Sequence, residues 1–175
     1  MKILVISASP RNNSHSRVLA NVASNYFKEK KLEVNMIDLN ENRVDSFRGF
    51  GEEYSEETLK AIEAMNEHDL FIISTPVYNL SFSSALKNLF EHLNVKNQKG
   101  KVAGFIMNAG GPISHIQVHS NLNTMMNYFA IFSNPKAVYV NYADFDKEMK
   151  VSSELVKERI KYLVDSSIDI AGKLK

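Results

Sequence analysis

The segment Ile3-Leu4-Val5-Ile6-Ser7-Ala8-Ser9-Pro10-Arg11 decides the fold that we expect for this chain. Its four consecutive apolar residues predict a strand that is covered on both faces, as in the middle of a parallel sheet. The polar run that begins at Ser7 predicts a loop after this strand. Apolar residues at helical spacing within 16–28 then predict a helix. The chain therefore begins with the strand, loop and helix of an α/β protein.

Four further apolar runs repeat the pattern, at residues 34–37, 70–73, 102–107 and 137–140. Helical spacing marks four more helices, at residues 55–65, 85–93, 118–129 and 155–168. This alternation predicts a parallel sheet with crossover helices on both faces. Polar and apolar residues alternate over 33–38, which is typical of an edge strand. Right-handed crossovers then favour five strands in the order 2-1-3-4-5.

Composition limits the class of protein. The 175 residues suit a single domain, 1–175, and the balance of 21 Lys and Arg against 20 Asp and Glu argues against nucleic-acid or membrane partners. The chain has no cysteine, which excludes disulfides and thiolate chemistry and is compatible with a reducing compartment. No apolar run approaches the ~20 residues of a membrane span. We therefore expect a cytoplasmic protein.

The loop after the first expected strand is rich in groups that bind phosphate. It carries the hydroxyls of Ser9, Ser14 and Ser16 and the Arg11 guanidinium, and it leads into a helix. The N–H groups and the dipole at a helix start attract a dianion, and a guanidinium adds charge-assisted hydrogen bonds. The same residues also suit a plain connection in which Ser14 or Ser16 only caps the helix. Both interpretations stay open at this point.

Two later loops have features that suit a flat ring. After the third expected strand, Pro76 stiffens a turn and Tyr78 supplies an aromatic surface. After the fourth, Gly110 and Gly111 let the backbone approach a ring closely. Each loop alone is also an ordinary turn. In sheets of this order, however, ligands bind beyond the carboxyl ends of the strands, where these loops lie.

Several familiar nucleotide and phosphate sites are excluded. Residues 7–17 contain no glycine, so neither the G-x-G-x-x-G fingerprint nor a Walker A loop is present. Without cysteine the chain is no low-molecular-weight tyrosine phosphatase. The serines after the first strand also replace the acidic cluster of a receiver domain.

Together the three loops resemble those of the NAD(P)H-dependent FMN reductases of the flavodoxin-like superfamily, which include bacterial azobenzene reductases. The resemblance covers essentially the whole chain. Its motifs are Ser9-Pro10-Arg11 with Ser14 and Ser16, Pro76-Val77-Tyr78-Asn79 with Ser84-Ala85-Leu86-Lys87-Asn88, and Ala109-Gly110-Gly111. It implies a flavodoxin-like three-layer sandwich, a five-stranded parallel sheet in the order 2-1-3-4-5, bound FMN, and NADPH or NADH as co-substrate.

The resemblance also implies which residues bind the cofactor. The FMN phosphate is expected to be surrounded by Ser9, Arg11, Ser14, His15 and Ser16. The ribityl chain and isoalloxazine ring are expected to lie along Pro76, Val77, Tyr78 and Asn79, and the pyrimidine end to meet Ala109, Gly110 and Gly111.

The implied activity is FMN-dependent transfer of electrons from NADPH to a quinone, azo compound, flavin or similar acceptor. Hydride transfer to a flavin needs no ionisable side chain, so we expect no catalytic residue. The histidines are not spaced as a metal site. A flavodoxin-type electron carrier and a non-catalytic FMN-binding protein are the alternatives, although such carriers are usually strongly acidic. The sequence leaves the acceptor, and the choice between NADPH and NADH, open.

Two features bear on partners. The longest irregular stretch, residues 40–54, carries Phe47, Phe50 and Tyr54, which suit either a functional loop or aromatic anchors. Relatives pair through the third and fourth helices, so we expect a homodimer, with a tetramer as the larger option. Apolar residues that are expected to supply this interface, if they are not core, are Phe82, Leu93, Met125, Met126 and Phe129.

Overall fold

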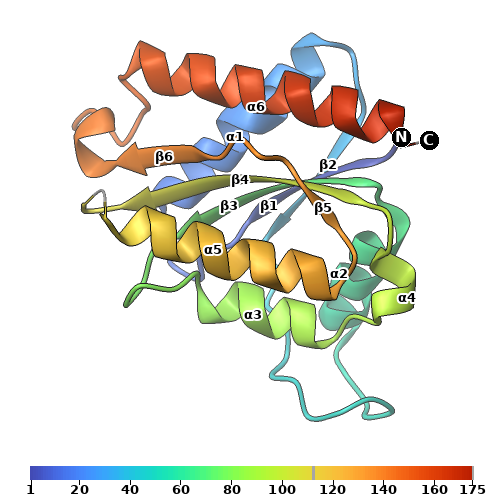
Figure 1. Cartoon of the computed structure of the whole chain (residues 1–175). Helices are drawn as coiled ribbons and strands as arrows, with labels where there is room; N and C mark the ends of the chain where they lie inside the picture. Colours follow the sequence, from blue (N-terminus) through green and yellow to red (C-terminus); the bar gives the residue numbers. More distant parts are fainter. Residues whose placement is uncertain (112, 175) are drawn as a thin grey trace.

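A single parallel sheet forms the centre of the computed structural model, which describes residues 1–111 and 113–174. Its neighbouring strands are, in order, β2 (Val34–Asp38), β1 (Ile3–Ser7), β3 (Leu70–Pro76), β4 (Val102–Ala109) and β5 (Phe132–Ser133), and β6 (Val138–Asn141) also pairs with β4. The predicted order 2-1-3-4-5 is confirmed (Figure 1).

The fifth position of the sheet differs from the single strand that we expected. It is filled by two strands, because β5 pairs with Val102 and Ala103 while β6 pairs with residues 106–109. Pro135 lies between them. Since proline has no backbone N–H, it cannot continue a ladder through this point. The sheet therefore has six strands, and β5 is the one that the sequence did not predict.

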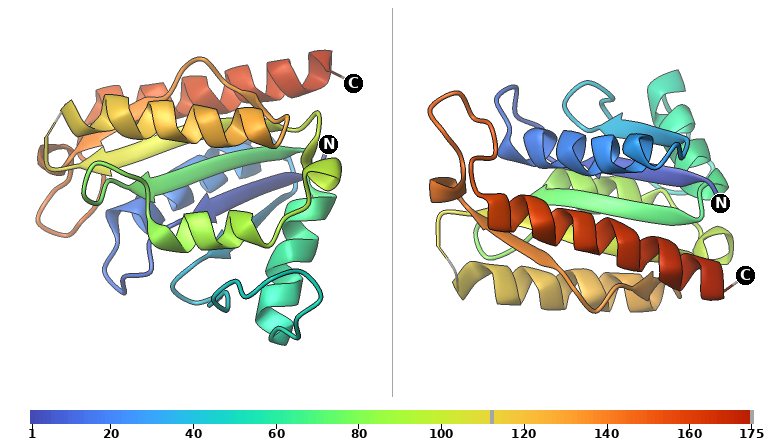
Figure 2. Two further views of the ribbon diagram at one scale, coloured as in Figure 1. Left: turned by 60° about the horizontal axis from the view of Figure 1, so that its bottom comes forward. Right: turned by 90° about the horizontal axis from the view of Figure 1, so that it is seen from above.

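Helices cover both faces of the sheet (Figures 1 and 2). One face carries α1 (His15–Glu29) and α6 (Glu154–Lys173), and the other carries α2 (Glu56–Glu67), α3 (Ser84–Glu91) and α5 (Ile113–Tyr128). The short helix α4 (Val95–Gln98) and a 3-10 turn at Tyr142–Asp144 were not expected. Serine side chains at positions 14, 55, 83 and 153 cap α1, α2, α3 and α6.

The core consists of two layers, one on each face. Along β1, Ile3 and Val5 pack toward α1 and α6, whereas Leu4 and Ile6 pack toward α3 and α5. This alternation explains why the strand needs four apolar residues in succession.

Some residues that we expected at a dimer interface belong to the core instead. Leu93, Met126 and Phe129 are buried in the layer beneath α3 and α5. Phe82 and Met125 are only partly buried and retain apolar surface. The prediction that Leu93, Met126 and Phe129 supply exposed apolar surface was therefore wrong.

Within the described residues, no helix is both long and apolar enough to cross a bilayer.

Candidate functional site

The loops that follow β1, β3 and β4 lie at the same end of the sheet (Figure 2). Parallel strands bring their carboxyl ends to one edge, so residues far apart in the sequence meet there. Ser7 lies opposite Ser74, and Pro76 lies opposite Asn108. This arrangement brings together the three loops that the sequence singled out.

Hydrogen bonds tie these loops to one another. Val77 N–H donates to the Asn108 carbonyl at 2.9 Å, which joins the loop after β3 to the end of β4. The buried Ser83 hydroxyl donates to the Ala8 carbonyl, and Ala8 N–H donates to the Ser74 carbonyl at 2.8 Å. The loops therefore form one cross-linked surface.

The start of α1 offers backbone donors to an anion. Ser14 is the N-cap, and its hydroxyl oxygen accepts from Arg17 N–H at 3.3 Å. Among the described residues, no acceptor receives the N–H groups of His15 and Ser16. The first N–H groups of a helix have no partner within the helix, and the helix dipole makes this end attractive to negative charge. An anion at this end would satisfy both groups.

Three of the predicted phosphate residues occupy different environments. Ser9 is 1% exposed; its hydroxyl accepts from Arg11 N–H at 3.3 Å and lies 3.5 Å from the Tyr78 hydroxyl. Arg11 itself is exposed at the loop surface. Ser14 acts as the cap, as the alternative interpretation held, although its own hydroxyl hydrogen remains available as a donor.

Ser16 has a specific partner inside the protein. Its hydroxyl is fully buried and donates to Asn108 Oδ1 at 2.6 Å. The hydroxyl hydrogen of Ser16 is thus used in the bond to β4. Of the donors of this residue, the backbone N–H is the one left to bind a phosphate. The bond fastens the first turn of α1 to the end of β4, next to Ala109 and Gly110.

His15 packs against the segment that follows β6. Its ring stacks on Tyr142, with centroids 5.1 Å apart, and contacts Phe145 at 4.2 Å. Burial, and to a smaller extent the charge of Arg11, lower the pKa of His15 below its usual 6.5. The lowered pKa favours the neutral imidazole, and its ring joins the start of α1 to the segment after β6.

Sequence reasoning missed Arg17 as a positioning residue. Its guanidinium pairs with Asp38 at the end of β2 and donates to the Asn12 carbonyl at 2.9 Å. The hydrogen bond with Asp38 raises the pKa of Arg17. Because Asp38 and Arg17 are 21 residues apart, only the parallel pairing of β1 with β2 brings them together.

The loop after β3 contains a strained turn. Tyr78 and Ser81 exchange two backbone hydrogen bonds, and the residues between them, Asn79 and Leu80, have positive φ angles of 49° and 63°. Leucine pays a conformational cost in this region, and such strain is concentrated at functional sites. Pro76 is the last residue of β3, Val77 and Tyr78 are half-buried, and Asn79 is exposed.

The third loop leaves open space beside its backbone. Ala109 is buried at the end of β4. A Cβ atom added to Gly110 would touch the Tyr142 ring at 3.6 Å, whereas one added to Gly111 would meet nothing within 4 Å. The protein itself therefore does not require glycine at Gly111. A ligand that approaches this backbone closely would require it.

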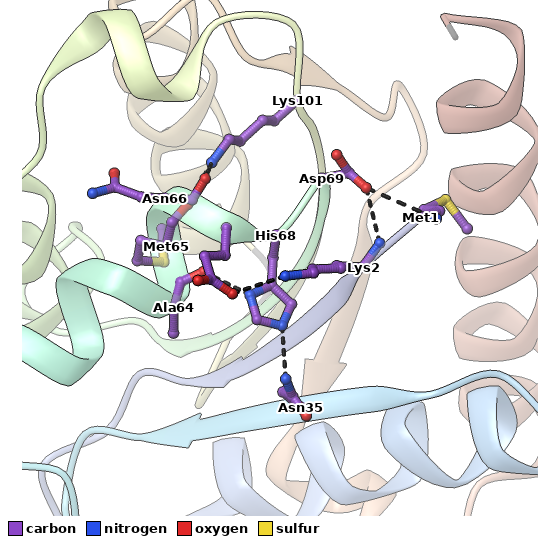
Figure 3. Close-up of polar contacts among 10 residues, drawn as sticks. Met1, Lys2, Asn35, Ala64, Met65, Asn66, His68, Asp69 and Lys101 are labelled. Atoms are coloured by element: carbon purple, nitrogen blue, oxygen red, sulfur yellow. Dashed lines mark hydrogen bonds and ion pairs between the residues drawn. The ribbon is translucent and has the colours of Figure 1, made fainter.

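A second polar cluster lies at the opposite, amino-terminal end of the strands (Figure 3). Lys101 Nζ donates to the carbonyls of Met65 and Asn66 at 2.5 and 2.8 Å, at the end of α2. Burial lowers the pKa of Lys101 to about 8. A cation that binds the last carbonyls of a helix stabilises the helix end, so this cluster has a structural role.

Among the described residues, no group of His, Asp and Glu is arranged to hold a metal.

Comparison with solved structures defines the class of fold. The chain superposes on an NADH:FMN oxidoreductase in its apo form with a TM-score of 0.82 at 20% identity, covering 99% of this chain and 90% of the other. An oxidoreductase from Corynebacterium diphtheriae gives a TM-score of 0.78 at 19% identity, covering 98% and 97%. Structures described as flavodoxins are also similar, with TM-scores of 0.68. The fold is thus flavodoxin-like.

Sequence comparison shows the family. Residues 1–144 match the model of the NADPH-dependent FMN reductase family. An FMN-dependent NADPH-azoreductase of Staphylococcus aureus is 30% identical over 99% of this chain and 90% of its own length. An NAD(P)H-dependent FAD/FMN reductase of Geobacillus thermodenitrificans is 27% identical over 83% of this chain and 79% of its own length. The chain belongs to the NADPH-dependent FMN reductase family; it is an oxidoreductase with FMN as cofactor and NAD(P)H as co-substrate.

The residues present fit FMN. The free N–H groups and Arg11 at the start of α1 suit a phosphate, and the open backbone at Gly111 suits a flat ring. Both features lie at one edge of the sheet and are joined through Ser16 and Asn108.

Proposed function

We propose that the chain passes electrons from NADPH, through FMN bound across the three loops, to a quinone, azo compound, free flavin or similar acceptor. The observation that carries this proposal is the cross-linked surface at the carboxyl ends of β1, β3 and β4, where the N–H groups at the start of α1 and the open space beside the Gly111 Cα lie together. Family membership supports the same function.

Within this proposal, the protein holds the phosphate with charge and with backbone donors. The side chains of Ser9, Arg11 and Ser14 and the N–H groups of His15 and Ser16 bind it, while the His15 ring supports the loop from behind. Pro76, Val77, Tyr78 and Asn79 border the sugar alcohol chain and the ring. The pyrimidine end of the ring meets Ala109, Gly110 and Gly111.

Bound FMN supplies a ring that takes a hydride from the nicotinamide and yields two electrons to the acceptor. The residues of the chain orient the two flat partners against that ring and need not ionise. If the three loops cover one side of the bound ring, as we propose, nicotinamide and acceptor would share the other side. They must then bind in turn.

Steady-state kinetics of the purified holoenzyme test this proposal. Initial rates are measured against menadione, a quinone, at several fixed NADPH concentrations. We expect sustained NADPH oxidation and parallel double-reciprocal lines. Intersecting lines would show that both partners bind at once and would contradict a shared face.

The same experiment separates the enzyme from an electron carrier or a non-catalytic FMN protein, because neither of these oxidises NADPH steadily. The net charge of +1 favours the enzyme over a carrier, since flavodoxin-type carriers are usually strongly acidic. We also propose that the enzyme works in the cytoplasm, where NADPH is available and where a chain without cysteine needs no oxidising compartment.

A further inference from the structure

The segment of residues 40–54 between β2 and α2, here called the β2–α2 loop, is fastened to α3. Asn88 Oδ1 accepts from Phe47 N–H at 2.9 Å, and Asn88 Nδ2 donates to the Asp45 carbonyl at 2.8 Å. The buried His92 ring donates from Nε2 to the same carbonyl at 2.9 Å. The loop is therefore held in one position relative to α3 and to the turn that precedes it.

Two of the three aromatic residues of this loop are anchors. The rings of Phe47 and Tyr54 contact His92 edge-on, with centroids 5.2 and 4.5 Å away. The Tyr54 hydroxyl accepts from Arg48 N–H at 2.8 Å and donates to the Gly49 carbonyl at 2.9 Å. The hydrogen bonds of Tyr54 lie within the loop and hold its tip in a closed conformation.

Phe50 is the third aromatic residue, and it is not an anchor. Gly49 and Gly51 flank it with positive φ angles of 128° and 91°, a backbone conformation that other residues rarely adopt. The resulting turn leaves Phe50 73% exposed, and its ring packs edge-to-face with Phe47, with centroids 5.3 Å apart. A large aromatic side chain held on a fixed turn presents a ring face on which a flat ligand can stack.

Phe50 lines the same cleft as the proposed flavin loop. This cleft, of about 1620 Å³, is bordered by Phe47 and Phe50 on one side, by Val77, Tyr78 and Asn79 on another, and by Met125 and Tyr128 of α5 on the face where we expect a second copy of the chain. In Figure 1 the β2–α2 loop projects beyond α3 from below the sheet. The cleft thus connects the exposed ring of Phe50 with the loop that is expected to border the isoalloxazine.

We infer that Phe50 is a specificity-determining residue that stacks on flat aromatic acceptors as they enter this cleft. The inference rests on the proposed function. Its ligand class is a planar, largely apolar ring system such as a quinone or an azo compound, because Phe50 offers a ring face and no charge. A second copy of the chain is the competing occupant of an exposed ring at this position.

The first test measures binding without turnover. Menadione is titrated into the oxidised holoenzyme in the absence of NADPH, and its dissociation constant is determined by calorimetry. Phe50→Ala removes one aromatic stacking partner and the area that it would bury. We therefore expect it to weaken menadione binding about tenfold. Phe50→Tyr keeps the ring and is expected to bind like the wild type. Leu59→Ala removes an exposed apolar residue on α2 outside the cleft and serves as the matched control.

The second test compares two acceptors in turnover. We expect Phe50→Ala to raise the KM for menadione about tenfold and to leave the rate with ferricyanide, which has no flat ring, unchanged. FMN content and sedimentation of each variant are measured in parallel. An unchanged menadione dissociation constant in FMN-loaded Phe50→Ala would overturn the inference. So would a change of oligomeric state in this variant, because Phe50 would then cover another copy of the chain.

Failure of the proposed function gives a different result. In that case the wild type lacks FMN or does not oxidise NADPH, whatever residue stands at position 50. A wild type that turns over ferricyanide but binds menadione no better than Phe50→Ala refutes only the role of Phe50.

Discussion

At the scale of single residues, the site depends on a few groups around the start of α1. Arg11 brings the one guanidinium among the predicted phosphate residues and lies at the protein surface. Ser9 accepts from its backbone N–H and so shapes the loop that carries it. Arg17, by contrast, is paired with Asp38 and supports the loop from the side. The two arginines therefore have separate roles.

Replacing Arg11 tests the phosphate site. A charge-assisted hydrogen bond contributes about 1.5 to 3 kcal/mol, so Arg11→Ala should weaken FMN binding by roughly one to two orders of magnitude. The dissociation constant is measured by adding FMN to apoprotein and following the quenching of flavin fluorescence. Arg159→Ala, an exposed arginine on α6, is the control. Unchanged FMN affinity in the folded Arg11→Ala variant would contradict the assignment of the phosphate to this loop.

The pKa of His15 gives an independent measure of the Arg11 charge in this loop. Because burial and Arg11 both lower this pKa, the imidazole should titrate below 6.5 in the apoprotein, as followed by NMR. Arg11→Ala should move the midpoint upward. Below pH 6.5 the unfolded chain binds more protons at this position than the folded chain, so stability is lost as the pH falls toward the folded-state pKa. The stability difference between wild type and His15→Gln should accordingly be larger at pH 7.5 than at pH 5. A midpoint at or above 6.5 would contradict the half-buried position of His15 beside Arg11.

At the scale of elements, hydrogen bonds between helices and strands join the three loops. The bond from Ser16 to Asn108 is the clearest case, because it is buried and spans 92 residues of sequence. Spacing along the chain gives no hint of this contact. It depends on α1 lying over β4, which follows from the order of the strands.

Removing this bond should cost stability more than cofactor binding. Ser16→Ala leaves a buried Asn108 oxygen without its donor, which destabilises the fold by about 1 to 3 kcal/mol. Since the backbone N–H of Ser16 is retained, FMN affinity should change less than in Arg11→Ala. Chemical unfolding of the apoprotein measures the first effect, with Ser46→Ala in the exposed loop as control. A stable Ser16→Ala variant with lost FMN affinity would assign the hydroxyl to the phosphate instead.

The elements also show how far the sequence predicts the structure. Apolar runs of four or more residues marked β1, β3 and β4, because strands covered on both faces need such runs. The two-residue strand β5 and the single turn α4 are too short to have a period. Residues of the three loops were predicted from their chemistry and from the family resemblance, whereas Arg17 and Asn108 act through contacts that only the folded chain creates.

At the scale of the whole molecule, the face of α3 and α5 retains exposed apolar surface. Met125 is partly exposed, and Tyr128, which the sequence analysis did not consider, is 72% exposed. Leu93, Met126 and Phe129 lie beneath them in the core and shape this surface without belonging to it. A homodimer through these helices remains our expectation.

Light scattering at micromolar concentration tests the dimer. We expect a mass of twice the 19.8 kDa of one chain, and a larger multiple for a tetramer. Tyr128→Glu places a charge in the expected interface and should shift the protein toward monomer, because an unpaired charge there would have to be desolvated. A wild-type monomer would show that this face serves another purpose.

The central claim, that this chain holds FMN and reduces it with NADPH, is tested most directly by an anaerobic titration of the purified protein. We expect a yellow protein that releases one FMN per chain on denaturation. Stepwise NADPH should bleach the oxidised-flavin absorbance with an end point of one NADPH per FMN, and air should restore it. A folded protein that neither retains nor takes up FMN, or one whose bound flavin stays oxidised with NADPH in excess, would contradict the claim.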